Sequence, residues 1–171
     1  MEAMMLKAWV NRPPEEANLF NPAFIGSLIY EFTKEYKKQK SEPAPLEFFP
    51  IFLAVVLHAN TRKRLPGSTV TSLYEWLQNN EDSKIGFAER SIGIMPYIKE
   101  SIRFGIARST LAMGDGHSVD IGSERAHFTA AFLRETTAET KEIIERSKFI
   151  ARWFAKSGSE VSIIGAWGIK P

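Results

Sequence analysis

Apolar residues recur every three or four positions through most of the chain, which is the spacing of helices that bury one face. The first such stretch begins at Asn21 and Pro22, because Asn caps free helix amides and Pro at the first position has its φ already set. We expect this helix to reach about Lys38. Residues 48–57 (FFPIFLAVVL) are the most apolar run and predict the central helix of the fold. Pro50 within this run either lies in the first turn or kinks the helix.

The middle of the chain predicts two more helices and a hairpin. Ser72 and Glu75 have capping-box spacing at the head of a short apolar face. A second helix is expected from near Ser83, with Pro96 marking a kink or a restart. In residues 110–122 apolar positions alternate with small and polar ones around a Gly-Asp-Gly turn, which predicts a β-hairpin. This order of helix, helix and hairpin is also that of a winged helix-turn-helix, whose recognition helix would be the segment at Pro96.

The C-terminal part predicts a short helix over residues 126–133 and then a long amphipathic helix. Thr136 and Glu139 have capping-box spacing at the start of the long helix. Residues 159–171 form an apolar tail, which is either a strand or a turn of helix with an extended end.

These elements predict a mainly α fold with a small β-hairpin (α+β), for which a winged helix-turn-helix-like core with flanking helices is the more specific form. The length of 171 residues suits one compact domain, and we expect residues 1–171 to form it. Residues 1–20 contain two consecutive prolines and are expected to be an extended lead-in with room for one short turn.

Composition narrows the classes of function. Lys and Arg number 22 and Asp and Glu number 20, so the net charge of +2 gives no strong field for attracting DNA or an acidic membrane. The absence of Cys excludes disulfides, thiolate zinc sites and Cys nucleophiles, and it favours a cytoplasmic protein. The run 48–57 is too short to cross a bilayer, which takes about 20 helical residues, so no membrane is expected as a partner.

The search for catalytic motifs is negative. No phosphate-binding G-x-x-x-x-G-K-[ST] and no G-x-S-x-G elbow occurs in the sequence. The three histidines, His58, His117 and His127, lack partners at metal-ligand spacing. We therefore predict that the chain is not an enzyme and holds neither a metal nor a cofactor.

Basic residues cluster locally although the net charge of the chain is near zero. One cluster lies in residues 62–67, which predict a basic loop. Another lies on the last long helix, where Lys148, Arg152 and Lys156 are spaced four apart and share a face. For these two clusters, phosphate contact or an acidic partner surface is as good an interpretation as solvent exposure. A third cluster, the lysines at the end of the first helix, fits the helix macrodipole. The residues expected to bind DNA or an acidic partner are Arg62, Lys63, Arg64, Arg146, Lys148, Arg152 and Lys156.

Two of the four tryptophans lie near the chain ends. Trp9 and Trp167, with Ile169 beside the latter, are candidates for docking on another protein, where Trp is a common anchor. Packing of each Trp into the chain's own core is the alternative interpretation.

Four blocks of sequence resemble a known family. They are WVNRPPEEANLFNPAF (residues 9–24), SLYEWLQNN (72–80), GFAER (86–90) and AWGIKP (166–171). Together they resemble the middle components of bacterial three-component ABC systems, as in Lamassu-like anti-phage defence.

The resemblance implies a small non-catalytic subunit that joins an ABC ATPase of the SMC or Rad50-like kind to an effector, often a nuclease. Such a subunit would also contribute to sensing double-stranded DNA within the complex. The alternative hypothesis is a free-standing winged-helix DNA-binding regulator, which the helix, helix, hairpin order favours.

Overall fold

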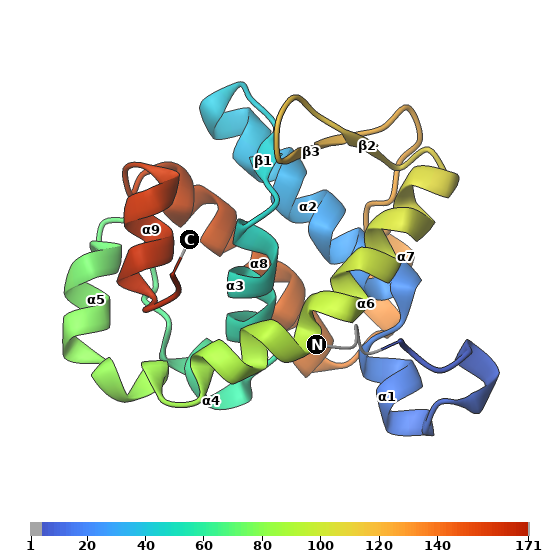
Figure 1. Cartoon of the computed structure of the whole chain (residues 1–171), viewed down its shortest axis with the longest axis horizontal. Coiled ribbons are helices and arrows are strands. Elements are labelled where there is room, and N and C mark those ends of the chain that lie inside the picture. Colours follow the sequence, from blue (N-terminus) through green and yellow to red (C-terminus); the bar gives the residue numbers. More distant parts are fainter. Residues whose placement is uncertain (1–4, 171) are drawn as a thin grey trace.

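The computed structural model describes residues 5–170, and helices dominate it (Figure 1). Helix α2 (Pro22–Lys40) runs through the middle and packs against α6 (Phe87–Ala107) and α8 (Ala138–Ala155). The predicted start of α2 is confirmed, because Asn21 Oδ1 accepts hydrogen bonds from the amides of Ala23 and Phe24 at 2.8 and 3.4 Å.

The predicted central helix is α3 (Phe48–Val56), whose side chains are buried except for Pro50. Pro50 is the third residue of α3 and so occupies the first turn, where its missing amide breaks no intrahelical bond. Helix α3 packs on α6 and α8. The short helix α4 (Ala59–Arg64) follows. The predicted basic loop over residues 62–67 is therefore wrong for residues 62–64, which are helical, and confirmed for residues 65–67, which lie outside any helix or strand.

Helix α5 (Leu73–Asn79) begins after Ser72 as expected, although the Ser72 side chain makes no capping hydrogen bond. A 3-10 turn, η2 (Glu81–Lys84), separates α5 from α6. The start of α6 therefore lies later than the predicted Ser83. Pro96 lies inside α6, which continues through it without a restart.

A three-stranded antiparallel sheet lies beside one end of α2 (Figure 1). Strands β2 (Leu111–Met113) and β3 (Ser118–Ile121) form the predicted hairpin, with Leu111 opposite Ile121. Strand β1 (Ala44–Pro45) pairs with the other edge of β3, giving the order β1-β3-β2. The mainly α fold with a small β element is confirmed, and the winged-helix form remains a prediction, since element order alone does not establish it.

The remaining elements refine the predictions for both ends of the chain. Residues 1–4 of the predicted extended lead-in lie outside the described residues. Residues 5–20 are not simply extended, because they contain the 3-10 turn η1 (Trp9–Asn11) and helix α1 (Pro14–Leu19). Helix α7 (Ala130–Glu135) precedes α8, and α9 (Glu160–Ala166) makes the helical interpretation of the tail the right one.

The N-cap of α8 is Thr137 and not the expected Thr136. The Thr137 hydroxyl oxygen accepts a hydrogen bond from the Thr140 amide at 3.1 Å.

Aromatic side chains join these helices into one core. Phe32 of α2 stacks on Phe52 of α3 with ring centroids 4.3 Å apart, and Phe154 of α8 meets Phe32 edge-on. Within residues 5–170, no helix combines the length and apolar character that crossing a bilayer takes.

Candidate partner and nucleic-acid interface

The predicted interface begins at Arg62, and the structure places its side chain in the interior. Arg62 is 2% exposed. Its Nη1 donates to the carbonyl oxygen of Val56 at 2.7 Å, its Nη2 to Glu139 at 2.9 Å and its Nε to Glu142 at 2.8 Å. All of its nitrogens are engaged, so the expectation that Arg62 faces DNA or an acidic partner is corrected. Its role is to tie α4 to the first turns of α8.

Lys63 and Arg64 differ from their neighbour. Lys63 is exposed. Arg64 makes a two-pronged contact with Asp82, at 2.6 and 2.8 Å, and also donates to the side chain of Asn80. This arrangement raises the Arg64 pKa and lowers the pKa of Asp82, in both cases chiefly through their hydrogen bond. Lys63 is therefore the member of the triplet best placed to meet a phosphate.

The basic residues of α8 are spread over different surroundings. Arg146 donates to the carbonyl oxygen of Pro66 at 2.9 Å and its guanidinium lies over the ring of Phe149, so packing holds it in place. Arg152 lies 3.8 Å from Glu35 of α2. Lys156 is exposed and donates to the Thr69 hydroxyl at 3.1 Å.

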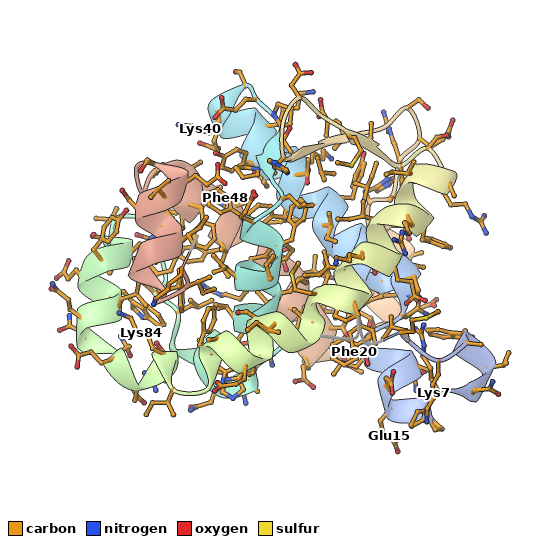
Figure 2. The ribbon with its side chains drawn as sticks, viewed as in Figure 1. Lys7, Glu15, Phe20, Lys40, Phe48 and Lys84 are labelled. Carbon is orange, nitrogen blue, oxygen red and sulfur yellow. The ribbon has the colours of Figure 1, made fainter. Side chains whose placement is uncertain are left out.

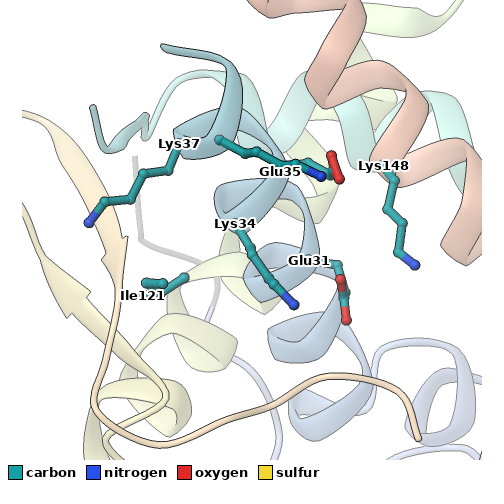
Figure 3. Close-up of a pocket in the computed structure, with 7 residues that line it drawn as sticks. Glu31, Lys34, Glu35, Lys37, Ile121 and Lys148 are labelled. Atoms are coloured by element: carbon teal, nitrogen blue, oxygen red, sulfur yellow. The ribbon is translucent and has the colours of Figure 1, made fainter. Parts of the chain in front are cut away.

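Lys148 is the member of the α8 cluster that joins a larger feature. It faces an open groove between α2, β3 and α8, with a volume of about 410 Å³ (Figure 3). We call this the lysine groove. Its lining consists of four lysines, two glutamates and one apolar residue: Lys34, Lys37, Lys38, Lys148, Glu31, Glu35 and Ile121.

Part of the charge in the lysine groove is neutralised. Lys37 Nζ bonds both carboxylate oxygens of Asp120, at 2.9 and 2.8 Å, and Lys148 lies 3.6 Å from Glu145. Lys34 and Lys38 are exposed and form no ion pair among the described residues. These two side chains therefore offer a modest local attraction for an anion.

The N-terminal segment is held to the body by Arg12. Its guanidinium forms a bidentate pair with Glu100 of α6, at 2.8 and 2.6 Å, and lies over the rings of Trp9 and Tyr97. The bond to Glu100 raises the pKa of Arg12 against the opposing effect of burial. Burial and a hydrogen bond to Glu16 raise the pKa of the Tyr97 hydroxyl to about 12.

Trp9 itself remains 41% exposed, as a docking residue would be. Figure 2 shows Phe20 where this segment meets the body, with Lys7 and Glu15 further out. The Phe20 ring stacks on Tyr97 at 4.2 Å.

The other predicted docking residues pack against the chain's own core. Trp167 is 2% exposed and stacks on Phe87 with ring centroids 4.7 Å apart, and Trp76 lies on another side of it. Ile169 is partly buried against the same core. Docking of Trp167 on another protein is therefore corrected to self-packing, which was the alternative interpretation.

Sequence reasoning missed the acidic partners that decide which basic residues are available. Glu139 and Glu142 lie 77 and 80 positions from Arg62, and Glu100 lies 88 positions from Arg12. No local spacing signals such pairs. In the part of the chain that the structure describes, no group of three His, Asp or Glu side chains is placed to hold a metal ion.

A family model described as "ABC-three component (ABC-3C) system Middle Component 3" matches residues 9–171. The chain belongs to this family. Membership implies that this middle component acts together with the other components of an ABC-3C system. No curated protein and no solved structure matches the chain.

Proposed function

We propose that this middle component is a non-catalytic bridging subunit, which joins an ABC ATPase of the SMC or Rad50-like kind to an effector such as a nuclease. The system would act in Lamassu-like bacterial defence against phages or plasmids. The observation that carries the proposal is the family match, which runs from residue 9 to residue 171.

The surface of the chain is consistent with a shared contact to DNA. Lys34, Lys38 and Lys63 are exposed cations, whereas Arg62 and Arg64 are committed to carboxylates. A complex that surrounds DNA with several subunits needs only a few phosphate contacts from each. The proposed contribution to DNA sensing is therefore one made within the assembly and not by the isolated chain.

Co-expression with the ATPase and effector of the same three-component system tests the bridging role. The three chains are expected to co-elute in size exclusion, and omission of this chain is expected to separate the ATPase from the effector. Elution of this chain by itself in every combination would contradict the proposed bridging role.

A second candidate function is a free-standing winged-helix regulator, favoured by the order of α5, α6 and the β2–β3 hairpin. It predicts that the isolated chain binds duplex DNA with a steep salt dependence. Lys99 and Arg103 are exposed cations on α6, so a Lys99→Glu, Arg103→Glu double change is expected to abolish this binding. An Arg134→Glu, Lys141→Glu double change, at exposed cations of α7 and α8 outside these elements, serves as the matched control. No duplex binding at low salt would remove this candidate.

A further inference from the structure

A second groove, with a volume of about 420 Å³, lies where α1 and the start of α2 meet the end of α3, α7 and the start of α8. Its apolar lining comes from five different segments of the chain: Leu19, Phe24, Leu57, Phe132 and Ile143. We call it the α1–α7 groove. Ile143 is buried, and Phe24 and Leu57 are partly buried against the core, so the floor of the groove is part of the packed core.

The two walls of this groove carry exposed apolar side chains. Leu19 at the end of α1 is 42% exposed, and Phe132 on α7 is 40% exposed. Neither α1 nor α7 has a single buried residue. Large apolar side chains that border a hollow and remain open to water are typical of surfaces that another molecule covers.

The charges that line the groove all have one sign. Glu15 of α1 and Glu139 of α8 supply them, and no Lys or Arg is among the lining residues. One carboxylate oxygen of Glu139 accepts a hydrogen bond from Arg62, and Glu15 makes no ion pair among the described residues. An apolar floor with carboxylates at its rim is complementary to an apolar surface flanked by cations.

The walls also restrict the form of the occupant. They are helices and helix ends, whose backbone groups are bonded within the helices or to caps, as the Thr129 hydroxyl is to the Phe132 amide. A strand would find no free edge to pair with here. A helix satisfies its own backbone and presents apolar side chains at three- and four-residue spacing.

We infer that the α1–α7 groove is the docking site for an amphipathic helix of another subunit. Apolar side chains of that helix contact Leu19 and Phe132, and a Lys or Arg beside them pairs with Glu15. This inference rests on the proposed function, since it assigns a surface to the ATPase or effector that the chain bridges. It adds Leu19 and Phe132 to the exposed Trp9 as apolar residues that can face a partner, whereas Trp167 is buried.

The test uses the co-expressed complex and two substitutions that introduce a negative charge on different helices, Leu19→Glu and Phe132→Glu. Each is expected to weaken association with one partner by about tenfold or more, because a carboxylate replaces an apolar anchor at the centre of the contact. Val161→Glu places the same charge on an exposed apolar site of α9 and is expected to leave association within about twofold. Thermal unfolding of each isolated variant shows whether it keeps its fold.

The charge of the partner is tested separately. Glu15→Lys is expected to weaken association and to reduce its salt dependence, whereas Glu81→Lys on η2 is expected to change neither. A photo-crosslinking amino acid at position 132 is expected to capture a partner segment in which Lys or Arg flanks apolar residues. Capture of an acidic segment overturns the inference.

The outcomes separate the two proposals. Co-elution of the wild-type chain that survives both groove variants overturns the docking site and leaves the bridging role standing. Failure of the wild-type chain to co-elute overturns the bridging role and with it the partner assigned to the groove. Light scattering that shows the isolated chain to be a dimer broken by Leu19→Glu would instead make a second copy the occupant, and it also overturns the inference.

Discussion

Arg62 illustrates the condition under which a charged side chain is tolerated in an interior. Its guanidinium is desolvated, and all of its nitrogens have acceptors on two other helices. Removing such a group leaves the Val56 carbonyl oxygen and two carboxylates without their donor. The two carboxylates lie at the surface, where water compensates part of that loss.

We expect Arg62→Met to lower the free energy of unfolding by about 2–4 kcal/mol, because methionine retains the apolar stem and loses the bonds. Urea unfolding monitored by circular dichroism measures the change. Lys63→Met, at the exposed neighbour, is the matched control and is expected to stay within about 0.5 kcal/mol. Equal effects at the two positions would contradict the role given to Arg62.

His58 gives the chain a pH dependence of known sign. Burial lowers the pKa of His58, and the nearby charges of Arg90 and Arg62 lower it further. Both effects favour the neutral imidazole in the folded state, and the ring Nδ1 lies 2.8 Å from the Thr61 hydroxyl oxygen.

Stability from this group is fully present above about pH 6.5, the pKa of an unfolded-chain histidine. It is lost as the pH falls below that value, because the unfolded chain then binds the proton more readily. We expect urea midpoints to fall between pH 7.5 and pH 5.5, and His58→Gln to fall less over the same interval. Identical slopes for the two chains would contradict the prediction.

What the sequence predicts at this scale is the local chemistry and not the partners. The Asn21 cap was predictable because its acceptor and donors lie within three residues of each other. The burial of Arg62 was not, because a run of three basic residues is typical of a surface, and the carboxylates that compensate it come from another part of the chain. The lysine groove was not predicted for the same reason, because Lys148 lies near the lysines of α2 only in the folded chain.

Among the elements, α6 contains a conflict between local preference and tertiary packing. Pro96 has no amide to donate within the helix, yet α6 runs from Phe87 to Ala107. Burial of one face, including Ile94, Ile98 and Ile102, against α2 and α3 outweighs this loss. From the sequence alone, Pro96 predicted a kink or a restart of the helix, because the packing of α6 on α2 and α3 cannot be read from the sequence.

We expect Pro96→Ala to raise the free energy of unfolding by about 1–3 kcal/mol, because alanine restores a backbone bond and favours the helix. Differential scanning calorimetry is a suitable measurement. Pro50→Ala in the first turn of α3 is the control, and little gain is expected there because that amide has no intrahelical acceptor. A gain at Pro50 as large as at Pro96 would contradict the explanation.

Some elements were too short for any pattern to reveal. Strand β1 has two residues, one of them Pro45, so it shows no alternation and exists only through pairing with β3. Helix α4 was missed because its six residues are mostly polar and basic. The long helices and the hairpin were predictable because their periodicity spans enough residues to stand out.

Aromatic rings connect the C-terminal end to the middle of the chain. Trp167 stacks on Phe87 of α6 and lies near Trp76 of α5, which in turn meets Trp153 of α8 edge-on. Because these contacts join segments about 80 residues apart, unfolding of one is expected to release the others.

We therefore expect one cooperative transition, with tryptophan fluorescence and far-UV circular dichroism giving the same midpoint. Trp167→Ala is expected to lower the free energy of unfolding by about 3–5 kcal/mol through the cavity that it leaves. Trp167→Phe should lose less, because it keeps the stack on Phe87 and removes an indole N–H that has no acceptor among the described residues. Separate midpoints for the two probes would instead indicate two units.

The small sheet bears on how other components can attach. One of its edges is β1, where Pro45 lacks an amide, and the other is the three-residue β2. Such edges are poor templates for an incoming strand, and they also protect the chain from edge-to-edge aggregation. Addition of a partner strand to the sheet is thereby disfavoured. Partners are then expected to contact side chains that project from helices. Single substitutions of such side chains can change the choice of partner without loss of the fold.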